Sequence, residues 1–186
     1  MIVGSLRIEP STGIFPATFI SKASTLVIKL INTSSEDFRG EWRKYGSAAE
    51  EQEILECIRT HMSGQRDKIP ESLKFKSEIF LFDSSPFEIG PNRSHMIAIN
   101  FTPESANFYR EIVYLYDVDT HERAEFILQG EGKPPIGKLN VESINIGHIL
   151  LDNVYEYQFI LKNEGEIPFD FRIKNEIRKG IEFRFY

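Results

Sequence analysis

Apolar and polar residues alternate with a period of two over much of this chain, a pattern that predicts β-strands. The clearest case lies in residues 96–101, where Ile97, Ile99 and Phe101 share one side. Residues 25–31 are mostly apolar and β-branched, which predicts a well-buried strand. Further strands are expected at residues 38–45, 87–89, 108–116 and 124–129. Short strands at regular spacing, with turn signals between them, predict an all-β fold, an antiparallel β-sandwich.

Two segments of the β-rich region carry additional signals. Leu73, Phe75, Ile79 and Leu81 occupy odd positions, so we expect them to lie on one face of the chain. Residues 130–135 read Gly-Glu-Gly-Lys-Pro-Pro, a cluster that predicts a turn between one structural unit and the next.

The period changes at about residues 47–63, which predict an α-helix inserted into the β-domain. Ser47 and Glu50 match the S-x-x-E capping box, and several glutamates place negative charge in the first turns. Gly64 stands where a C-terminal cap is expected. We expect the apolar stripe of this helix to pack on its own sandwich or, alternatively, to dock on a neighbouring protein. The stripe consists of Ile54, Leu55, Ile58 and Met62.

The chain also contains an internal repeat. Residues 6–9 (Leu-Arg-Ile-Glu) return 133 positions later as residues 139–142 (Leu-Asn-Val-Glu). Each copy precedes a β-rich run that ends in asparagine, Asn32 or Asn163, and a phenylalanine follows six residues after each asparagine. A repeated β-unit indicates modular architecture.

The repeat predicts two domains. We expect residues 1–132 to form one complete sandwich that carries the helical insertion. Residues 133–186 amount to 54 positions (186 − 132), whereas a sandwich domain needs roughly 100 residues. The second segment is therefore expected to be the N-terminal part of another domain, and the chain a piece of a longer array.

Charge and cysteine content restrict the possible partners. The net charge is −6, and the surplus lies before residue 133, with 20 acidic against 14 basic residues; eight of each follow. An acidic surface disfavours capture of nucleic acid or anionic membrane. Cys57 is the single cysteine, so no internal disulfide forms and a reducing, cytoplasmic compartment is expected. The sequence shows neither a secretory leader nor the roughly 20 apolar residues that a membrane span needs.

Residues that commonly carry chemistry are isolated in this sequence. The histidines lack partners at the spacings that metal sites use, and Gly130-x-Gly132 lacks the lysine and hydroxyl residue of a phosphate loop. Asp117 and Asp119 are expected in a hairpin turn, with a weak cation site as the alternative. We therefore expect no catalytic residue, no cofactor, no metal and no small-molecule substrate. The histidines are His61, His95, His121 and His148.

The order of motifs between residues 86 and 135 resembles a known family. Residues 87–92 read Phe-Glu-Ile-Gly-Pro-Asn, residues 97–103 end in Phe-Thr-Pro, Tyr109 follows, and residues 126–132 end in Gly-Glu-Gly before two prolines. A proline-bearing turn, a strand closing with F-x-P and a last strand closing with G-x-G resemble the ASH/MSP-like immunoglobulin domains. The similarity is closest to the domains arrayed in tandem in Hydin and related ciliary proteins. The inserted helix is the main departure from a minimal module.

This resemblance implies an immunoglobulin-like fold and an architectural role. The implied protein is a non-enzymatic scaffold of the ciliary or flagellar axoneme, in the central pair apparatus, that supports cilium assembly and motility. Its implied partners are other axonemal proteins and neighbouring modules of the same chain. An adaptor that binds acidic or phosphorylated peptides in a basic groove stays open as the alternative, and an enzyme is the third possibility.

Overall fold

The computed structural model describes residues 2–3, 5–61, 72–145 and 147–173. The chain divides into two compact units, Met1–Pro134 (unit 1) and Pro135–Tyr186 (unit 2). The predicted boundary, after residue 132, lies two residues before this division.

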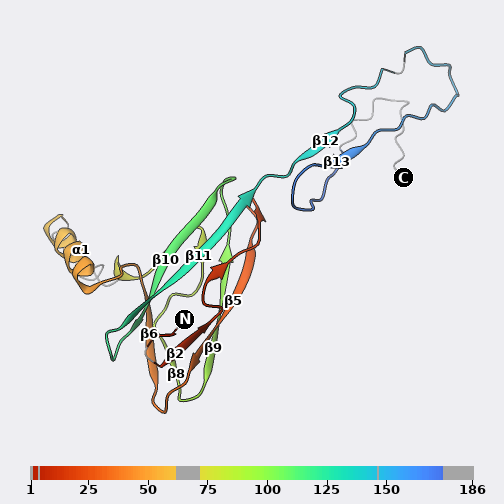
Figure 1. Ribbon diagram of the computed structural model, residues 1–186. Helices are drawn as coiled ribbons and strands as arrows, with labels where there is room; N and C mark the ends of the chain where they lie inside the picture. Colours follow the sequence, from red (N-terminus) through yellow and green to blue (C-terminus); the bar gives the residue numbers. More distant parts are fainter. Residues whose placement is uncertain (1, 4, 62–71, 146, 174–186) are drawn as a thin grey trace. The chain divides into compact units, whose positions relative to one another are not determined.

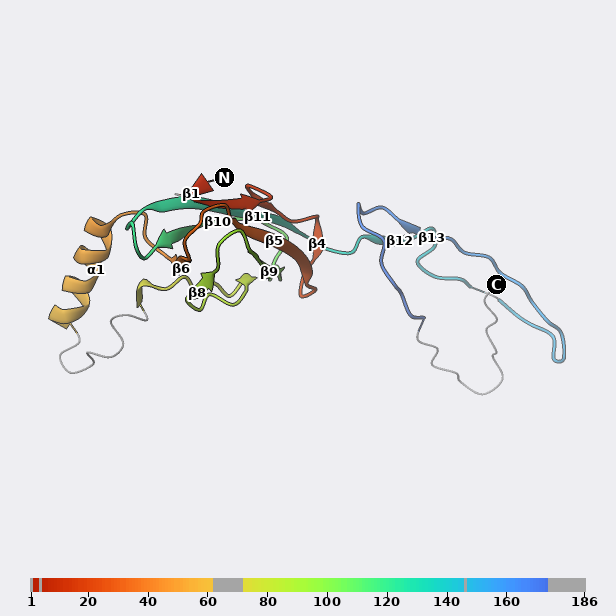
Figure 2. The same ribbon diagram turned by 90° about the horizontal axis from the view of Figure 1, so that it is seen from below.

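Unit 1 is a sandwich of two β-sheets (Figures 1 and 2). The five-stranded sheet has the order β1-β2-β5-β9-β7, with strands Ile2–Val3, Leu6–Glu9, Ser24–Asn32, Ser94–Phe101 and Phe80–Leu81. The other sheet has the order β3-β11-β10-β6-β8, with strands Gly13–Ile14, Arg123–Lys133, Phe108–Asp117, Phe38–Arg43 and Phe87–Ile89; β4 (Thr18–Phe19) also pairs with β11. The strand pairs are antiparallel, except that β3 and β4 run parallel to β11. The predicted all-β sandwich is confirmed.

The predicted strands supply the core between the two sheets. In β9, Ile97, Ile99 and Phe101 are buried, while the residues between them are exposed, as the alternation predicts. Trp42 of β6 is 1% exposed and packs edge-on against Phe82 with ring centroids 5.5 Å apart. Trp42 is therefore a core residue of the sandwich.

The prediction for residues 73–82 is wrong at one position. Leu73 and Phe75 are buried, but Leu81 is 48% exposed and Phe80, its neighbour, is 1% exposed. The backbone explains the change of face, because Phe80 and Leu81 form β7 and pair with Phe101 and Asn100 of β9. This strand belongs to the five-stranded sheet, whereas Lys74 bridges to Arg43 of β6 in the other sheet. The chain crosses between sheets, so one odd–even rule does not hold across the segment.

The predicted turn at residues 130–132 is also wrong, because β11 continues to Lys133. Both glycines lie where another segment approaches closely. A Cβ atom at Gly130 would lie 2.6 Å from the Phe101 ring, and one at Gly132 would lie 2.2 Å from the Ser105 carbonyl oxygen. The G-x-G and F-x-P motifs therefore contact each other, and glycine permits this approach without a turn.

The inserted helix α1 spans Ala48–His61, against a prediction of about 47–63. It follows β6 and belongs to unit 1. Residues 62 and 63 of the predicted helix lie outside the described residues.

Unit 2 contains one strand pair among its described residues, β12 (Gly137–Leu139) with β13 (Leu161–Asn163). Asn163 lies opposite Gly137, whereas Asn32 lies opposite Leu6 in unit 1. Leu139 is therefore equivalent to Ile8, and the sequence alignment of Leu6 with Leu139 is two residues out. A shift of two leaves each side chain on the same face, so the apolar pattern alone does not reveal it.

Candidate functional site

The predicted docking surface is the apolar stripe of α1. This helix begins at Ala48, and a capping box stabilises its first turn. The amide of Glu50 donates to Ser47 Oγ at 3.2 Å. Glu50 Oε2 accepts hydrogen bonds from the amides of Gly46 (3.0 Å) and Ser47 (3.2 Å). The predicted capping box is confirmed, and it satisfies amides that have no partner inside the helix.

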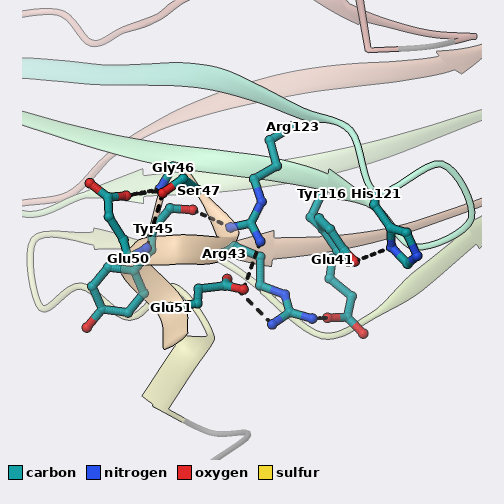
Figure 3. Close-up of polar contacts among 10 residues, drawn as sticks. All are labelled: Glu41, Arg43, Tyr45, Gly46, Ser47, Glu50, Glu51, Tyr116, His121 and Arg123. Atoms are coloured by element: carbon teal, nitrogen blue, oxygen red, sulfur yellow. Dashed lines mark hydrogen bonds and ion pairs between the residues drawn. The ribbon is translucent and has the colours of Figure 1, made fainter. Parts of the chain in front are cut away.

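A buried ion cluster, the helix anchor, joins the first turn of α1 to the six-stranded sheet (Figure 3). It consists of Glu51 in α1, Arg43 in β6 and Arg123 in β11. Glu51 is 8% exposed, and its Oε2 atom accepts a hydrogen bond from Arg123 Nη2 at 2.8 Å. Arg43 Nη1 lies 3.7 Å from Glu51 Oε1, and Arg123 Nη1 donates to the Tyr45 carbonyl at 2.7 Å. A buried carboxylate between two guanidinium groups specifies one arrangement of the helix base, because displacement of Glu51 would take the carboxylate partner away from the largely buried Arg123 guanidinium.

An aromatic ring supports the two arginines of the helix anchor. The guanidinium carbons of Arg43 and Arg123 lie 4.8 Å and 5.0 Å from the centroid of the Tyr116 ring. The Tyr116 hydroxyl makes a 2.6 Å hydrogen bond with His121 Nδ1. Arg43 also pairs with Glu41 at 2.6 Å. The base of α1 is thus attached to β6, β10 and β11.

The apolar stripe of α1 lies along the same side as the anchor. Ile54, Leu55 and Ile58 follow Glu51 at three-, four- and seven-residue offsets, which places them on one side of a helix. The three side chains are partly exposed. Met62 lies outside the described residues. Figures 1 and 2 show α1 beside one end of the sandwich, where it covers neither sheet face. Whether the stripe serves a partner stays a prediction.

Other titratable groups named from the sequence have structural partners. Asp117 Oδ1 accepts the amides of Asp119 (2.9 Å) and Thr120 (3.3 Å), so this carboxylate shapes the predicted hairpin turn. Asp119 hydrogen-bonds to Arg39, and this contact lowers the pKa of the Asp119 carboxyl below its usual range. His95 stacks on Phe87 with centroids 5.9 Å apart. His148 is exposed, and the His61 side chain is not among those described.

The described residues hold no group of three or more His, Cys, Asp or Glu side chains placed to ligate a metal ion. In the same part of the chain, no helix has both the length and the apolar character needed to cross a membrane.

A shallow hollow of about 500 Å³ lies beside the edge strand β7. Its charged lining is mixed, one lysine and one glutamate, and does not form a basic groove. The amides of Ile79 and Phe80 donate to Ser77 Oγ at 3.0 and 2.9 Å, so these two amides are not available to an added strand. The lining residues are Phe75, Lys76, Ser77, Glu78, Phe80, Leu81, Phe82 and Ser84.

The helix anchor has no motif in the sequence that would identify it. Arg43, Tyr116 and Arg123 lie on three strands, and only the register of β10 sets Tyr116 opposite Glu41 of β6 and Arg123 of β11. The available signal was local, an alternation of charge at Arg39, Glu41 and Arg43 that marks an outward face.

Comparison with known proteins shows a clear sequence relationship. The chain is 23% identical to the Hydrocephalus-inducing protein (Hydin) of Mus musculus over 203 aligned positions, which cover 91% of this chain. It is 24% identical to the Homo sapiens homologue over 196 positions, covering 88% of this chain. In both cases it spans only 4% of the length of the relative. The expected resemblance to Hydin-type proteins is confirmed. No family model matches the chain.

Similar solved structures include other sandwich domains. The ASH/PapD-like domain 7 of human CEP192 aligns with a TM-score of 0.49 at 13% identity, covering 71% of this chain and 87% of that one. The MSP family member WR4 of C. elegans aligns with a TM-score of 0.40 at 10% identity, covering 69% of this chain and 98% of that one.

Proposed function

We propose, from the Hydin-like sequence and the β-sandwich, that this chain is a non-enzymatic scaffold segment of a long tandem immunoglobulin-like protein. The proposed location is the cytoplasmic axoneme of cilia or flagella, in the central pair apparatus, where the protein supports cilium assembly and motility. The observation that carries the proposal is the similarity to Hydin over about nine-tenths of the chain. Ciliary placement and partners come from that similarity, and the chain covers a small part of those relatives.

The described polar groups support an architectural role. Glu51, Arg43 and Arg123 fix a helix, and Asp117 shapes a turn. Catalysis needs groups that converge on a space where a substrate fits. The hollow beside β7 is shallow, and Lys76 and Glu78 are the charged residues of its lining. These side chains stabilise one conformation of the unit, which suits a load-bearing spacer.

We place the protein-docking surface on the apolar stripe of α1, at Ile54, Leu55 and Ile58. The helix also carries exposed Glu53 and Glu56. A partner with an apolar groove and a basic rim complements this surface, because such grooves bind amphipathic helices through residues spaced three and four apart. The helix anchor holds α1 at its first turn, so little ordering free energy is lost on docking.

A matched pair of substitutions tests this role. Ile54→Asp places a charge on the apolar stripe, and Gln52→Asp places the same charge two residues away at an exposed position. We expect Ile54→Asp to reduce capture of axonemal proteins from ciliary extract about tenfold, and Gln52→Asp to leave capture within about twofold. Circular dichroism checks that both variants keep their helix.

Three results would contradict the proposal in different ways. Equal capture of axonemal proteins by the Ile54→Asp and Gln52→Asp variants would show that the apolar stripe of α1 is not a docking surface. Strong, sequence-dependent signals on a phosphopeptide array favour a peptide-binding adaptor over a scaffold. Turnover by the purified chain in a broad hydrolase and phosphatase screen identifies an enzyme.

A further inference from the structure

Unit 2 repeats the local structure of unit 1 around one asparagine. Asn32 Nδ2 donates to the Glu36 carbonyl (2.7 Å), and Asn32 Oδ1 accepts the Ser34 amide (3.0 Å). Asn163 makes the same two bonds, with the Ile167 carbonyl (2.9 Å) and the Gly165 amide (2.9 Å). Both asparagines thus bind the residues two and four positions ahead. These bonds hold the chain in a tight turn directly after the strand.

Strand pairing sets the same correspondence between the units. Asn163 lies opposite Gly137 and Asn32 opposite Leu6, so equivalent positions are 131 residues apart (163 − 32 and 137 − 6). Leu139 pairs with Leu161, as Ile8 pairs with Leu30. The asparagine hydrogen bonds and the strand register therefore give the same correspondence between the two units, although the two strand pairs share little sequence.

The equivalent positions differ in exposure. Ile8, Ile28 and Trp42 are 1%, 0% and 1% exposed, whereas their equivalents Leu139, Phe159 and Ile173 are 50%, 37% and 45% exposed. Apolar residues are thus retained at positions that the described part of unit 2 leaves open to water. Further equivalent apolar pairs are Leu26 with Tyr157, Leu30 with Leu161, and Phe38 with Phe169.

Unit 1 shows what covers these positions. β9 pairs antiparallel with β5 on the edge that β2 leaves free, with Lys29 opposite Met96 and Ile31 opposite Ser94. The segment just before β9 also supplies the Ile89 and Gly90 carbonyls, which accept from Asn32 Nδ2 at 2.9 and 3.2 Å. In the described part of unit 2, β13 pairs with β12 alone.

We propose that the edge of β13 that faces away from β12, unpaired within the described residues, accepts an antiparallel strand with the apolar alternation of β9, in the register that unit 1 shows. The position equivalent to Met96 then lies opposite Ile160. The inward residues of the incoming strand cover Tyr157 and Phe159, and the backbone that leads into it supplies carbonyls to Asn163 Nδ2. The strand comes from the polypeptide that carries unit 2, because β9 reaches β5 within one polypeptide and the curated relatives are far longer than this chain. A second copy of this chain, pairing β13 with β13, is the competing occupant.

Fusion of a donor strand to the full chain tests the proposal. A flexible Gly/Ser linker after Tyr186 carries a copy of residues 93–103, and the control carries the same residues in an order that abolishes the alternation. Asn32 N donates to the Arg93 carbonyl at 2.9 Å, so alternate amides of β5, those of Leu30 and Ile28, face β9. The readout is therefore amide hydrogen exchange at Leu161, the equivalent of Leu30.

We expect the ordered donor to slow exchange at the Leu161 amide by about 100-fold and the scrambled donor to leave it unchanged. The amides of β5 report in the same spectrum that unit 1 is folded. Equal exchange in both fusions overturns the proposal. Concentration-dependent protection without any donor also overturns it, because a second copy then occupies the edge.

A disulfide tests the register in a Cys57→Ser background. Ile160→Cys, combined with cysteine at the donor position of Met96, is expected to form an intramolecular disulfide, because Lys29 and Met96 occupy the corresponding pair in unit 1. Cysteine at the donor position of His95 points to the other face and is expected to stay reduced. Preferential oxidation of the second pair contradicts the register.

Discussion

Asn32 and Asn163 end equivalent strands with the same pair of local hydrogen bonds, yet Asn32 is fully buried and Asn163 is exposed. The residues within six positions of each asparagine are sufficient for the turn and its cap. Burial depends instead on strands that lie far along the chain, since β9 begins 62 residues after Asn32 (94 − 32). In this fold, local sequence sets the shape of a strand end, and distant pairing makes it part of a core.

The largest expected difference between the units concerns two identical residues at equivalent positions. Leu30→Ala removes a side chain that is 0% exposed, and we expect it to lower the free energy of unfolding by about 2–5 kcal/mol. Leu161→Ala removes a partly exposed side chain, and we expect a loss of about 0.5 kcal/mol or less. Urea unfolding measures both, with Trp42 fluorescence reporting unit 1 and far-UV circular dichroism the whole chain. Similar losses in the two variants would break the comparison.

The asparagines give a smaller contrast. Asn32→Ala removes the side-chain amide that donates a hydrogen bond to the buried Ile89 carbonyl. We expect this substitution to lower the free energy of unfolding by about 1–3 kcal/mol. Asn163→Ala frees groups that water can reach, so a cost below about 1 kcal/mol is expected. The same urea experiments measure both costs. A larger cost at Asn163 would mean that unit 2 is closed in solution.

The smallest effect concerns pH, and it is expected in unit 1. The Arg39 guanidinium, through its hydrogen bond, lowers the pKa of the Asp119 carboxyl, and Ser85 lowers the pKa of Asp83 in the same way. A folded-state pKa below the unfolded value gives stability that is present above the unfolded pKa and is lost as pH falls through the folded pKa.

We therefore expect Asp119→Asn to weaken the dependence of unit 1 stability on pH below about pH 4, near the ordinary aspartate pKa. Both partners are exposed, so the expected change is small. This change is measured from the midpoints of urea unfolding, followed by Trp42 fluorescence, at a series of acidic pH values. An unchanged pH dependence would show that this ion pair does not contribute.

Much of the fold follows from local pattern. The alternation in residues 96–101, the strand 87–89 and the capping box of α1 all match the structure, because each depends on neighbours within a few residues. The predictions fail where a segment far along the chain determines the face or the element to which a residue belongs. Leu81 changes face because the chain crosses between sheets, and Gly130 lies in a strand because it pairs with Tyr109 of β10.

The site was less predictable than the fold. The apolar stripe of α1 is visible in the sequence, because helical spacing reveals it. The anchor formed by Glu51, Arg43 and Arg123 depends on how β6, β10 and β11 align, and no short-range pattern specifies that register.

The equivalence of the two units is tested most directly by nuclear magnetic resonance of the unmodified chain, from cross-strand contacts together with amide exchange. The expected result is a Gly137–Asn163 contact that matches the Leu6–Asn32 contact, with the Leu161 amide exchanging at least about 100-fold faster than that of Leu30. Leu139 lying opposite Asn163, or equal protection of Leu30 and Leu161, would contradict it.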